Sequence, residues 1–409
     1  MRELNMSELK IAKRLIMTPG PVSVDPRVSQ AMSNSILGQF DPDFTAIMDE
    51  TMELIRKSFL TENTWSFPVD GTSRAGLEAV ISSIVEPGDR VLVPIIGRFG
   101  HLFAELVQRA GGIVHTIECP VGEVLPQEEI IKALDIVKPK VLAIVHGETS
   151  TGRQQPIDKI GKACKERGVY SIVDAVATYL GTTIPVDEWE LDAVIGGAQK
   201  CLSIPSGITP ITFNERFSEA INTRKRVEEG IRTNEETEKE VFIRSNYFDL
   251  TQLQDYWSPR RLNHHTEATA MVYALNAGLK IAVGEGVENR AERHAYHHEG
   301  LKRALEALGL KIYGDANHEM KMVICVEIPE GVEPNEFRKS LLENYGVEIA
   351  GSFGELQNKI WRIGLMGYVV EKQNILTFLS IFSLFLQPQG VQGLNPVKAL
   401  DTLIKYYES

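Results

Sequence analysis

The chain has 409 residues, of which 43% are hydrophobic and 24% are charged, and its formal net charge at pH 7 is −12. This length allows two domains and a sizeable core, and the acidic balance argues against general binding to nucleic acid or to anionic membranes. We therefore expect a globular protein without either of those partners.

The N-terminal region predicts a helical arm that leads into an extended segment. Residues 1–16 are charged throughout, unlike a secretion signal. The prolines in Thr18–Pro21 end any helix. Asp41 and Pro42 then predict a new helix, with the aspartate as N-cap and the proline in the first turn. Apolar residues recur in it at helical spacing, namely Phe44, Ile47, Met48, Ile55 and Phe59.

From Trp65 onward, strand and helix patterns alternate. Strand-like segments cover 66–69, 90–94, 113–117, 141–146, 170–173, 193–195 and 209–213. Helical patterns between several of them cover 76–85, 101–110 and 157–167. Glycines at 111, 112 and 168 stand where helix ends need a residue that tolerates positive φ. Repeated βαβ units predict an α/β fold with a mostly parallel sheet between helices, and ligands outside the carboxyl ends of its strands.

The C-terminal part predicts a second, smaller αβ block. Residues 215–245 are highly charged and indicate a solvated helix or excursion, not a binding patch. Helices are expected over 268–283, 288–308 and 334–344, and strands over 322–328, 347–350 and 360–363. We expect an arm at 1–16, a large domain at 17–284, a small domain at 285–388 and a surface tail helix within 389–409.

Two further features bear on location. The apolar run 375–386 is about half the length of a membrane span, so it predicts a buried helix, with Asn374 as its cap. Four cysteines, at positions 119, 164, 201 and 325, lie far apart without metal-ligand spacing. Buried free thiols suit a reducing compartment, and we expect a cytoplasmic protein.

A lysine and an aspartate follow two of the predicted strands. Lys200 comes just after the strand-like segment 193–195. Burial disfavours an ammonium group, so this lysine is either a nucleophilic amine or an ordinary surface lysine. Asp174 ends the strand-like segment 170–173, where it is either a helix N-cap or a functional acid.

Two other loops add an anion site and an aromatic ring. Residues 69–74 form a turn rich in small residues before a helix, which either binds phosphate or only caps that helix. Phe99 lies in the glycine-flanked segment 97–100, as loop packing or as a stacking platform. Together with the lysine and the aspartate, these features fit pyridoxal phosphate, which needs a phosphate cradle, a lysine and a carboxylate at its ring nitrogen. Dinucleotide, Walker and nucleophile-elbow motifs are missing.

Several longer stretches carry a family resemblance. They are TPGPVSV, EPGDRVLV, HGETSTG, SIVDAVATYLGT, GGAQKCL and KIWRIGLMG. With them, the chain resembles the class V aminotransferases of pyridoxal phosphate fold type I over nearly its whole length. It is most similar to the alanine–glyoxylate, serine–pyruvate and ureidoglycine–glyoxylate branch. The resemblance implies a large cofactor-binding domain, a small C-terminal domain and transaminase activity.

The same resemblance assigns roles to the cofactor-site residues. Lys200 matches the lysine that forms the Schiff base, and Asp174 the partner of the pyridine nitrogen. The remaining cofactor positions are Phe99 and Val176 against the ring faces, Thr149 near the ring oxygen, and Thr72, Ser73, Arg74 and Gln199 on the phosphate side. Relatives often have histidine in place of Arg74.

Substrate and subunit contacts follow from the resemblance as well. Arg362 matches the arginine that clamps the substrate carboxylate, although without the resemblance it reads as a surface arginine at a strand end. Thr266 matches a residue that reaches the partner's cofactor phosphate, which implies a homodimer with shared active sites. The neighbouring His264 and His265 suggest a metal site, but adjacent histidines generally point apart and we expect no metal.

Two amides indicate the amino donor. Gln39 and Asn263 offer donors and acceptors that complement a ureido group, and Gly20 is a further substrate-binding candidate. We expect transfer from (S)-ureidoglycine to glyoxylate, giving oxalurate and glycine in purine catabolism, with alanine or serine as the alternative donor. A cysteine desulfurase is disfavoured because 351–359 contains no cysteine. A non-catalytic cofactor-binding module would be expected to lack Lys200 or Arg362.

Overall fold

The computed structural model describes residues 11–232 and 241–409. Its N-terminal helices are α1 (Pro26–Met32), α2 (Pro42–Phe59), α3 (Ser73–Ile84), α4 (Arg98–Arg109), α5 (Gln127–Val137) and α6 (Ile160–Glu166). Further along are α7 (Glu215–Asn222), α8 (Leu250–Trp257), α9 (Thr269–Glu285) and α10 (Val287–Leu308). The last three are α11 (Pro334–Tyr345), α12 (Lys372–Leu386) and α13 (Pro396–Glu408).

The strands belong to one large sheet and three small ones. The large sheet contains β2 (Trp65–Gly71), β3 (Arg90–Ile95), β4 (Ile113–Glu118), β5 (Val141–Val145), β8 (Tyr170–Asp174), β9 (Ala193–Ile195) and β10 (Gly207–Phe213). The others are β1 (Leu15–Ile16), β6 (Gly147–Glu148), β7 (Arg153–Gln154), β11 (Val323–Glu327), β12 (Val347–Glu348), β13 (Ala350–Gly351) and β14 (Ile360–Gly364).

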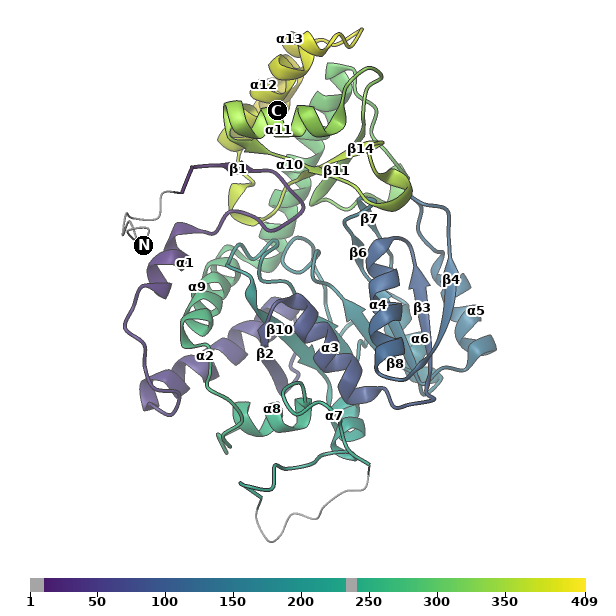
Figure 1. Ribbon diagram of the computed structural model, residues 1–409, viewed down its shortest axis with the longest axis vertical. Coiled ribbons are helices and arrows are strands. Elements are labelled where there is room, and N and C mark those ends of the chain that lie inside the picture. The colour runs from purple at the N-terminus through teal and green to yellow at the C-terminus, as the bar shows by residue number, and fades with distance from the viewer. Residues whose placement is uncertain (1–10, 233–240) are drawn as a thin grey trace, which may run out of the picture.

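The large sheet has the order β2-β10-β9-β8-β5-β3-β4 within the described residues. Strand β10 runs antiparallel to both of its neighbours, and the remaining pairs are parallel. Helices flank the sheet, with α3 and α4 in front of it in Figure 1. The prediction of a mostly parallel α/β fold is confirmed, and every strand segment predicted between residues 66 and 213 lies in this sheet.

Helix α2 shows how local sequence sets an element. Its N-cap Asp41 accepts a hydrogen bond from the backbone N–H of Asp43 at 2.8 Å, and Pro42 occupies the first turn. These contacts satisfy groups that a helix start otherwise leaves without partners. Phe44 and Met48 are fully buried, so the predicted apolar face packs on the core.

The helical arm predicted at the N-terminus is wrong where the structure describes it. Residues 11–14 have no regular structure, and β1 pairs in parallel with β12. The backbone N–H of Leu15 donates to Gly346 at 2.8 Å, and Met17 is completely buried. Long-range pairing therefore overrides the local helical pattern. Residues 1–10 of the predicted arm lie outside the described residues.

Other boundaries also differ from the predictions. Helix α12 starts at Lys372 with Glu371 as its N-cap, so the assignment of the cap to Asn374 is wrong. The Asn374 side chain instead donates to the carbonyl of Val369 at 3.2 Å. In the charged region, α7 buries Phe217 and Ile221, so only part of that region is solvated. Residues 233–240 of it lie outside the described residues.

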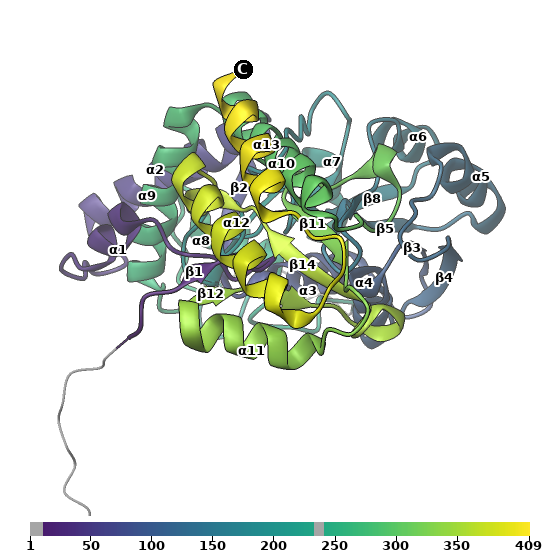
Figure 2. The same ribbon diagram turned by 90° about the horizontal axis from the view of Figure 1, so that it is seen from above.

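The buried side chains form two clusters. One surrounds the large sheet, and the other fills the space between α10–α13 and the antiparallel sheet β11-β14-β13. The helices α11, α12 and α13 lie over this small sheet at one end of the molecule (Figures 1 and 2). Ala399 and Leu403 of α13 are fully buried in the second cluster, while Val397 is 79% exposed, so this surface helix has one packed face.

These clusters support the proposed division into a large and a small domain, although the division itself stays a proposal. Met17 belongs to the second cluster and Met366 to the first, so the chain crosses between them more than once. Among the residues described, none of the helices combines the length and apolar character that crossing a membrane requires.

Candidate active site

A pocket of about 220 Å³ opens beyond the carboxyl ends of the large sheet's strands. Ligands of open α/β sheets bind at this edge. The pocket is lined by Thr72, Ser73, Arg74, Leu77, Phe99, Leu102, Gly147, Thr149, Asp174, Val176, Ala177, Gln199 and Lys200. The structure thus brings together every cofactor-site residue predicted from the sequence except Thr266.

Lys200 lies at the pocket wall, a few residues after β9. Burial, together with the positive charge of Arg362, lowers the pKa of its ammonium group to about 8. An amine in this range is available as a base and as a nucleophile near neutral pH. Its Nζ donates a hydrogen bond to the carbonyl of Pro19. The surface-lysine alternative is therefore wrong.

Gly20 lies directly against this lysine. A Cβ added at Gly20 would lie 2.5 Å from Nζ of Lys200, and its φ of +100° is a conformation that favours glycine. The same N-terminal segment is fixed to the small sheet, because the N–H of Gly364 donates to the carbonyl of Met17 at 2.7 Å. A backbone segment thus joins the lysine to strand β14.

Asp174 is the last residue of β8 and is buried in the pocket. Its Oδ1 accepts a hydrogen bond from the N–H of Val176 at 2.9 Å, and burial raises the pKa of the carboxyl to about 7. The nearby negative charge of Glu148 acts in the same direction. A protonated pyridine nitrogen beside this carboxylate would supply the missing positive partner. Asp174 therefore fits the expected cofactor.

The N-terminus of α3 forms the anion-binding side of the pocket. Thr72 is its N-cap, yet the threonine side chain makes no capping hydrogen bond. The Ser73 hydroxyl donates to Oε1 of Gln199 at 3.1 Å, and Arg74 adds a positive charge. Free backbone N–H groups, a hydroxyl and a guanidinium at a helix N-terminus suit a phosphate group.

Phe99 is not in a loop, as the sequence suggested, but in the first turn of α4. Its backbone N–H donates to Oε2 of Glu148 at 2.8 Å. The other oxygen of Glu148 accepts from the N–H of Ser150 at 2.9 Å, so a buried carboxylate joins α4 to β6. Sequence reasoning missed Glu148, although it stands within the quoted HGETSTG motif.

Arg362 lies in the middle of β14 and is only 6% exposed, so its reading as a surface arginine is wrong. Its Nε donates to the carbonyl of Gly351 at 2.6 Å, and Nη1 donates to that of Thr149 at 3.0 Å. Within the described residues, Nη2 makes no hydrogen bond. Burial lowers the pKa of the guanidinium to about 10.

An aromatic side chain that the sequence did not single out packs on this arginine. The Phe353 ring lies 4.7 Å from the guanidinium carbon of Arg362 and 4.0 Å from that of Arg98. Phe353 itself is 41% exposed. A lone aromatic residue in a loop carries no sequence signal that separates this position from ordinary packing.

The predicted donor-recognition residues lie outside this pocket. Nε2 of Gln39 donates to Oδ1 of Asn263 at 2.9 Å, and Oε1 of Gln39 accepts from the N–H of Glu267 at 3.0 Å. Gln39 and Thr266 line a separate surface hollow. Gln39 and Asn263 are thus paired although they are far apart in sequence. Within one chain, neither residue lines the cofactor pocket.

Comparisons with known proteins agree with this geometry. Residues 27–356 match the family described as aminotransferase class-V. The chain is 52% identical to (S)-ureidoglycine–glyoxylate transaminase of Bacillus subtilis, over 98% of this chain and 97% of that protein. It is 33% identical to alanine–glyoxylate aminotransferase of Drosophila melanogaster, over 92% and 93% of the two chains. The crystal structure of the Bacillus subtilis ureidoglycine–glyoxylate aminotransferase superposes with a TM-score of 0.93 over 98% of this chain and 100% of that one, at 51% identity.

Proposed function

The chain belongs to the class-V aminotransferases, which are pyridoxal-phosphate-dependent enzymes, and we propose that it transfers the amino group of (S)-ureidoglycine to glyoxylate. The products are oxalurate and glycine, and the reaction serves purine catabolism. The observation that carries the choice of donor is the amide pair Gln39–Asn263, joined at 2.9 Å, in a chain so similar to the Bacillus subtilis enzyme. Such a pair offers both donors and acceptors to a ureido group.

When bound, pyridoxal phosphate supplies an aldehyde that takes up the donor's amino group and a ring that accepts the electrons released at the donor's Cα. Nζ of Lys200 removes the Cα proton and returns it later, and a pKa of about 8 suits both steps near neutral pH. Asp174 would keep a proton on the ring nitrogen of the bound cofactor. Phe99 and Val176 would pack against the ring, and the N-terminus of α3 would bind the phosphate.

Arg362 binds the carboxylate that both substrates share. Gly351 and Thr149 hold its Nε and Nη1, so the guanidinium is oriented before substrate arrives. Orientation fixed in advance lowers the entropy that binding costs. Glyoxylate, held at the same place, receives the amino group in the second half of the reaction.

Arg362→Ala is expected to raise KM for both carboxylate substrates by about 100-fold, with a smaller change in kcat, because charge-assisted hydrogen bonds to the carboxylate are lost. Steady-state kinetics with each substrate varied in turn measure this effect. Arg338→Ala is the matched control, since Arg338 lies near Gly351 but hydrogen-bonds to Asn335. Equal KM values in wild type and Arg362→Ala would remove the proposed role.

The choice of donor is tested by a panel with glyoxylate as the acceptor. We expect kcat/KM for freshly generated (S)-ureidoglycine to exceed that for alanine and serine by about 100-fold, as expected for two or more hydrogen bonds. In Asn263→Ala this ratio should fall, while alanine turnover stays close to wild type. A wild-type preference for alanine or serine contradicts the ureidoglycine proposal but leaves the transaminase assignment intact.

We further propose a homodimer in which each subunit completes the other's site. The support is an apolar surface next to the amide pair: Ile36 is 64% exposed and Phe40 is 55% exposed, and Asn263 and Thr266 lie at the surface nearby. Burying such side chains against a second copy is favourable. In that assembly, Thr266 reaches the partner's phosphate site.

Phe40→Glu is expected to shift the protein from dimer to monomer, because it places a charge in the apolar contact. Light scattering coupled to size-exclusion chromatography measures the mass, and activity should fall with the dimer. Val397→Glu, at a residue 79% exposed on α13, is the control and should stay dimeric. A wild-type protein that is monomeric and active contradicts shared sites.

A cytoplasmic location is also part of the proposal. All four cysteines are free, and burial raises the pKa of Cys164, Cys201 and Cys325 to about 12. Thiols held in this state react slowly, and a reducing compartment is where unpaired cysteines are ordinarily found.

A further inference from the structure

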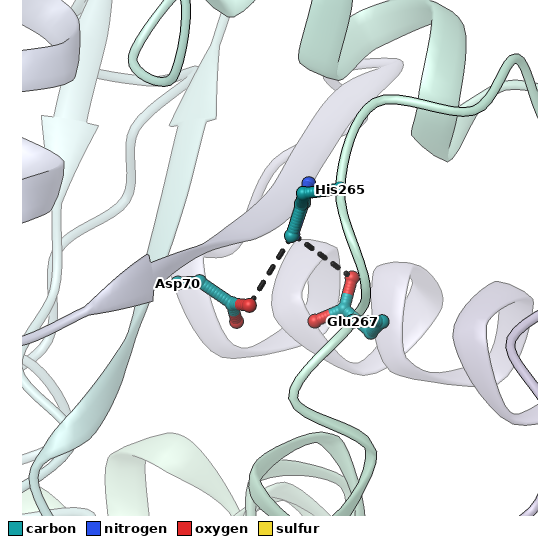
Figure 3. A group of neighbouring side chains, drawn as sticks. All are labelled: Asp70, His265 and Glu267. Carbon is teal, nitrogen blue, oxygen red and sulfur yellow. Dashed lines mark ion pairs between the residues drawn. The ribbon is translucent and has the colours of Figure 1, made fainter.

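Two carboxylates and one imidazole meet where the loop that carries Asn263 and Thr266 packs against the large sheet. Figure 3 shows Asp70, at the end of β2, facing His265 and Glu267 of this loop. Nε2 of His265 lies 3.2 Å from Oδ2 of Asp70 and 3.8 Å from Oε2 of Glu267. One nitrogen and two carboxylate oxygens lie within 4.8 Å of one another.

The neighbouring histidine determines which nitrogen of His265 carries hydrogen. Nε2 of His264 lies 3.0 Å from the carbonyl of Asn246, which only accepts, so this nitrogen is protonated. With Nε2 of His264 as a donor, the neutral ring carries its lone pair on the other nitrogen, Nδ1. Nδ1 of His265 lies 2.8 Å from Nδ1 of His264 and therefore donates a hydrogen bond to it. The expectation that the two histidines point apart is wrong.

This arrangement turns Nε2 of His265 toward the carboxylates. In the neutral ring, Nε2 carries a lone pair, so with both carboxyl groups ionised three acceptors face one another without a donor between them. If Nε2 is protonated instead, its hydrogen still does not point at a carboxylate oxygen, because Nε2 makes no hydrogen bond in the described structure. Like-signed groups at these distances repel each other unless a positive charge lies between them.

Three of the four carboxylate oxygens lack a partner within the described residues. Both side-chain oxygens of Glu267 and Oδ1 of Asp70 are buried there without a hydrogen bond, while Oδ2 of Asp70 accepts from the N–H of Ala268. The Glu267 side chain is 1% exposed. The hydroxyl of Tyr256, a residue that is also 1% exposed, has no hydrogen-bond partner in the described part of the chain, and burial, followed by the charges of Glu267 and Asp70, raises its pKa. Buried polar groups in proteins nearly always have a partner, so several orphaned atoms in one place indicate a missing ligand.

We propose that Asp70, His265 and Glu267 bind a divalent metal ion of the Zn²⁺ or Mn²⁺ class. An imidazole nitrogen with two carboxylate oxygens is a ligand set that such ions accept, and the separations of 3.2 and 3.8 Å suit bonds of about 2.0–2.2 Å to a shared ion. The contact from His265 to His264 and on to Asn246 is the outer support that metal-bound histidines require. Asp70 and His265 keep 10% and 11% of their side-chain surface exposed, which leaves a path for the ion.

The ion fastens the 263–268 loop to the edge of the large sheet. One contact of this kind is already present, since the N–H of Ala268 donates to Oδ2 of Asp70 at 3.3 Å. The backbone of Glu267 also orients Gln39 through the hydrogen bond to its Oε1. Metal binding therefore orders the amide pair and Thr266 without taking part in the chemistry. This inference stands independently of the proposed donor.

The test is direct metal analysis of the untagged holoenzyme. The protein is dialysed against a chelator, returned to chelator-free buffer and titrated with Zn²⁺ and, separately, with Mn²⁺ by calorimetry. Elemental analysis then gives the metal bound to each chain. We expect one ion per chain, a melting temperature that rises with the ion, and a Kd about 100-fold weaker or more in Glu267→Gln.

A control variant at another buried carboxylate distinguishes loss of metal binding from the general effect of replacing a buried glutamate. Glu319 is a similarly buried carboxylate that pairs with Lys302 at 2.6 Å, so Glu319→Gln should bind the ion like wild type. Should Glu267→Gln fail to fold, the Zn²⁺-dependent rise of the wild-type melting temperature still tests the site. Two results overturn the proposal. One is equal Zn²⁺ binding by wild type, Glu267→Gln and Glu319→Gln. The other is no uptake of Zn²⁺ or Mn²⁺ by wild type, in which case a Glu267→Gln protein at least as stable as wild type identifies a shared proton instead.

Discussion

Replacing Lys200 by alanine is expected to lower kcat/KM for transamination by about 10⁵-fold or more, which is roughly 7 kcal/mol of transition-state stabilisation. The variant loses both the amine that bonds to the cofactor and the base that moves the Cα proton. Among residues 11–232 and 241–409, no other lysine lines the pocket. The effect should fall mainly on kcat, because phosphate and carboxylate contacts remain.

Absorption and activity together check this expectation. In Lys200→Ala, the visible absorption of the lysine-bound cofactor should disappear, while cofactor added in excess should still bind through the N-terminus of α3. Lys280→Ala is the control, since Lys280 is a half-exposed lysine on α9 that pairs with Glu50. A Lys200→Ala protein that still completes many turnovers would falsify the central assignment.

Asp174→Asn is expected to lower kcat/KM by about 10³-fold, or roughly 4 kcal/mol. The amide has nearly the same shape but no charge, so it no longer keeps a proton on the ring nitrogen. The ring then accepts electrons from Cα less readily. Single-turnover rates with ureidoglycine and with alanine should fall together, because the defect lies in the cofactor's electronics and not in donor recognition.

In the protein without cofactor, we expect Asp174→Asn to increase stability against unfolding. Burial raises the pKa of Asp174 from 3.8 to about 7, so the folded state binds this proton more tightly than the unfolded state. The resulting stability is complete below about pH 4 and is lost as pH rises through 7. That loss is on the order of 4 kcal/mol, and an asparagine avoids it.

Calorimetry of the cofactor-free proteins measures this difference. Relative to wild type, Asp174→Asn should gain melting temperature between pH 5 and pH 8. Asp401→Asn makes the same substitution at an exposed position of α13 and serves as the control. A difference between Asp174→Asn and wild type that is constant over this pH range contradicts the role of Asp174 as an unpaired buried carboxyl.

Short-range signals predicted much of the fold and site. The strands of the large sheet are apolar segments bounded by turns, and α2 carries its own cap, so neighbouring residues suffice to place them. Lys200 follows a buried strand and Asp174 ends another, and the carboxyl ends of such strands meet at one edge of the sheet, so local sequence predicts that the two residues share a site.

Contacts between distant residues explain what the sequence did not predict. The N–H of Phe99 is bound by Glu148, which starts α4 earlier than the glycines around it suggested. Leu15 pairs with Val347, and no local pattern announces such a partner. His264 and His265 contact each other because Asn246 fixes the first ring.

The N-terminal segment between Met17 and Gly20 has a consequence for the order of events. Met17 is hydrogen-bonded to Gly364, two residues from Arg362, and Pro19 accepts the hydrogen bond from Lys200. A shift of β14 on carboxylate binding would therefore act on the amine through this backbone segment, and a movement of the amine would act on the arginine. Linkage requires these two influences to be equal in free energy. The segment is therefore a short covalent connection between the reactive lysine and the strand that carries the arginine.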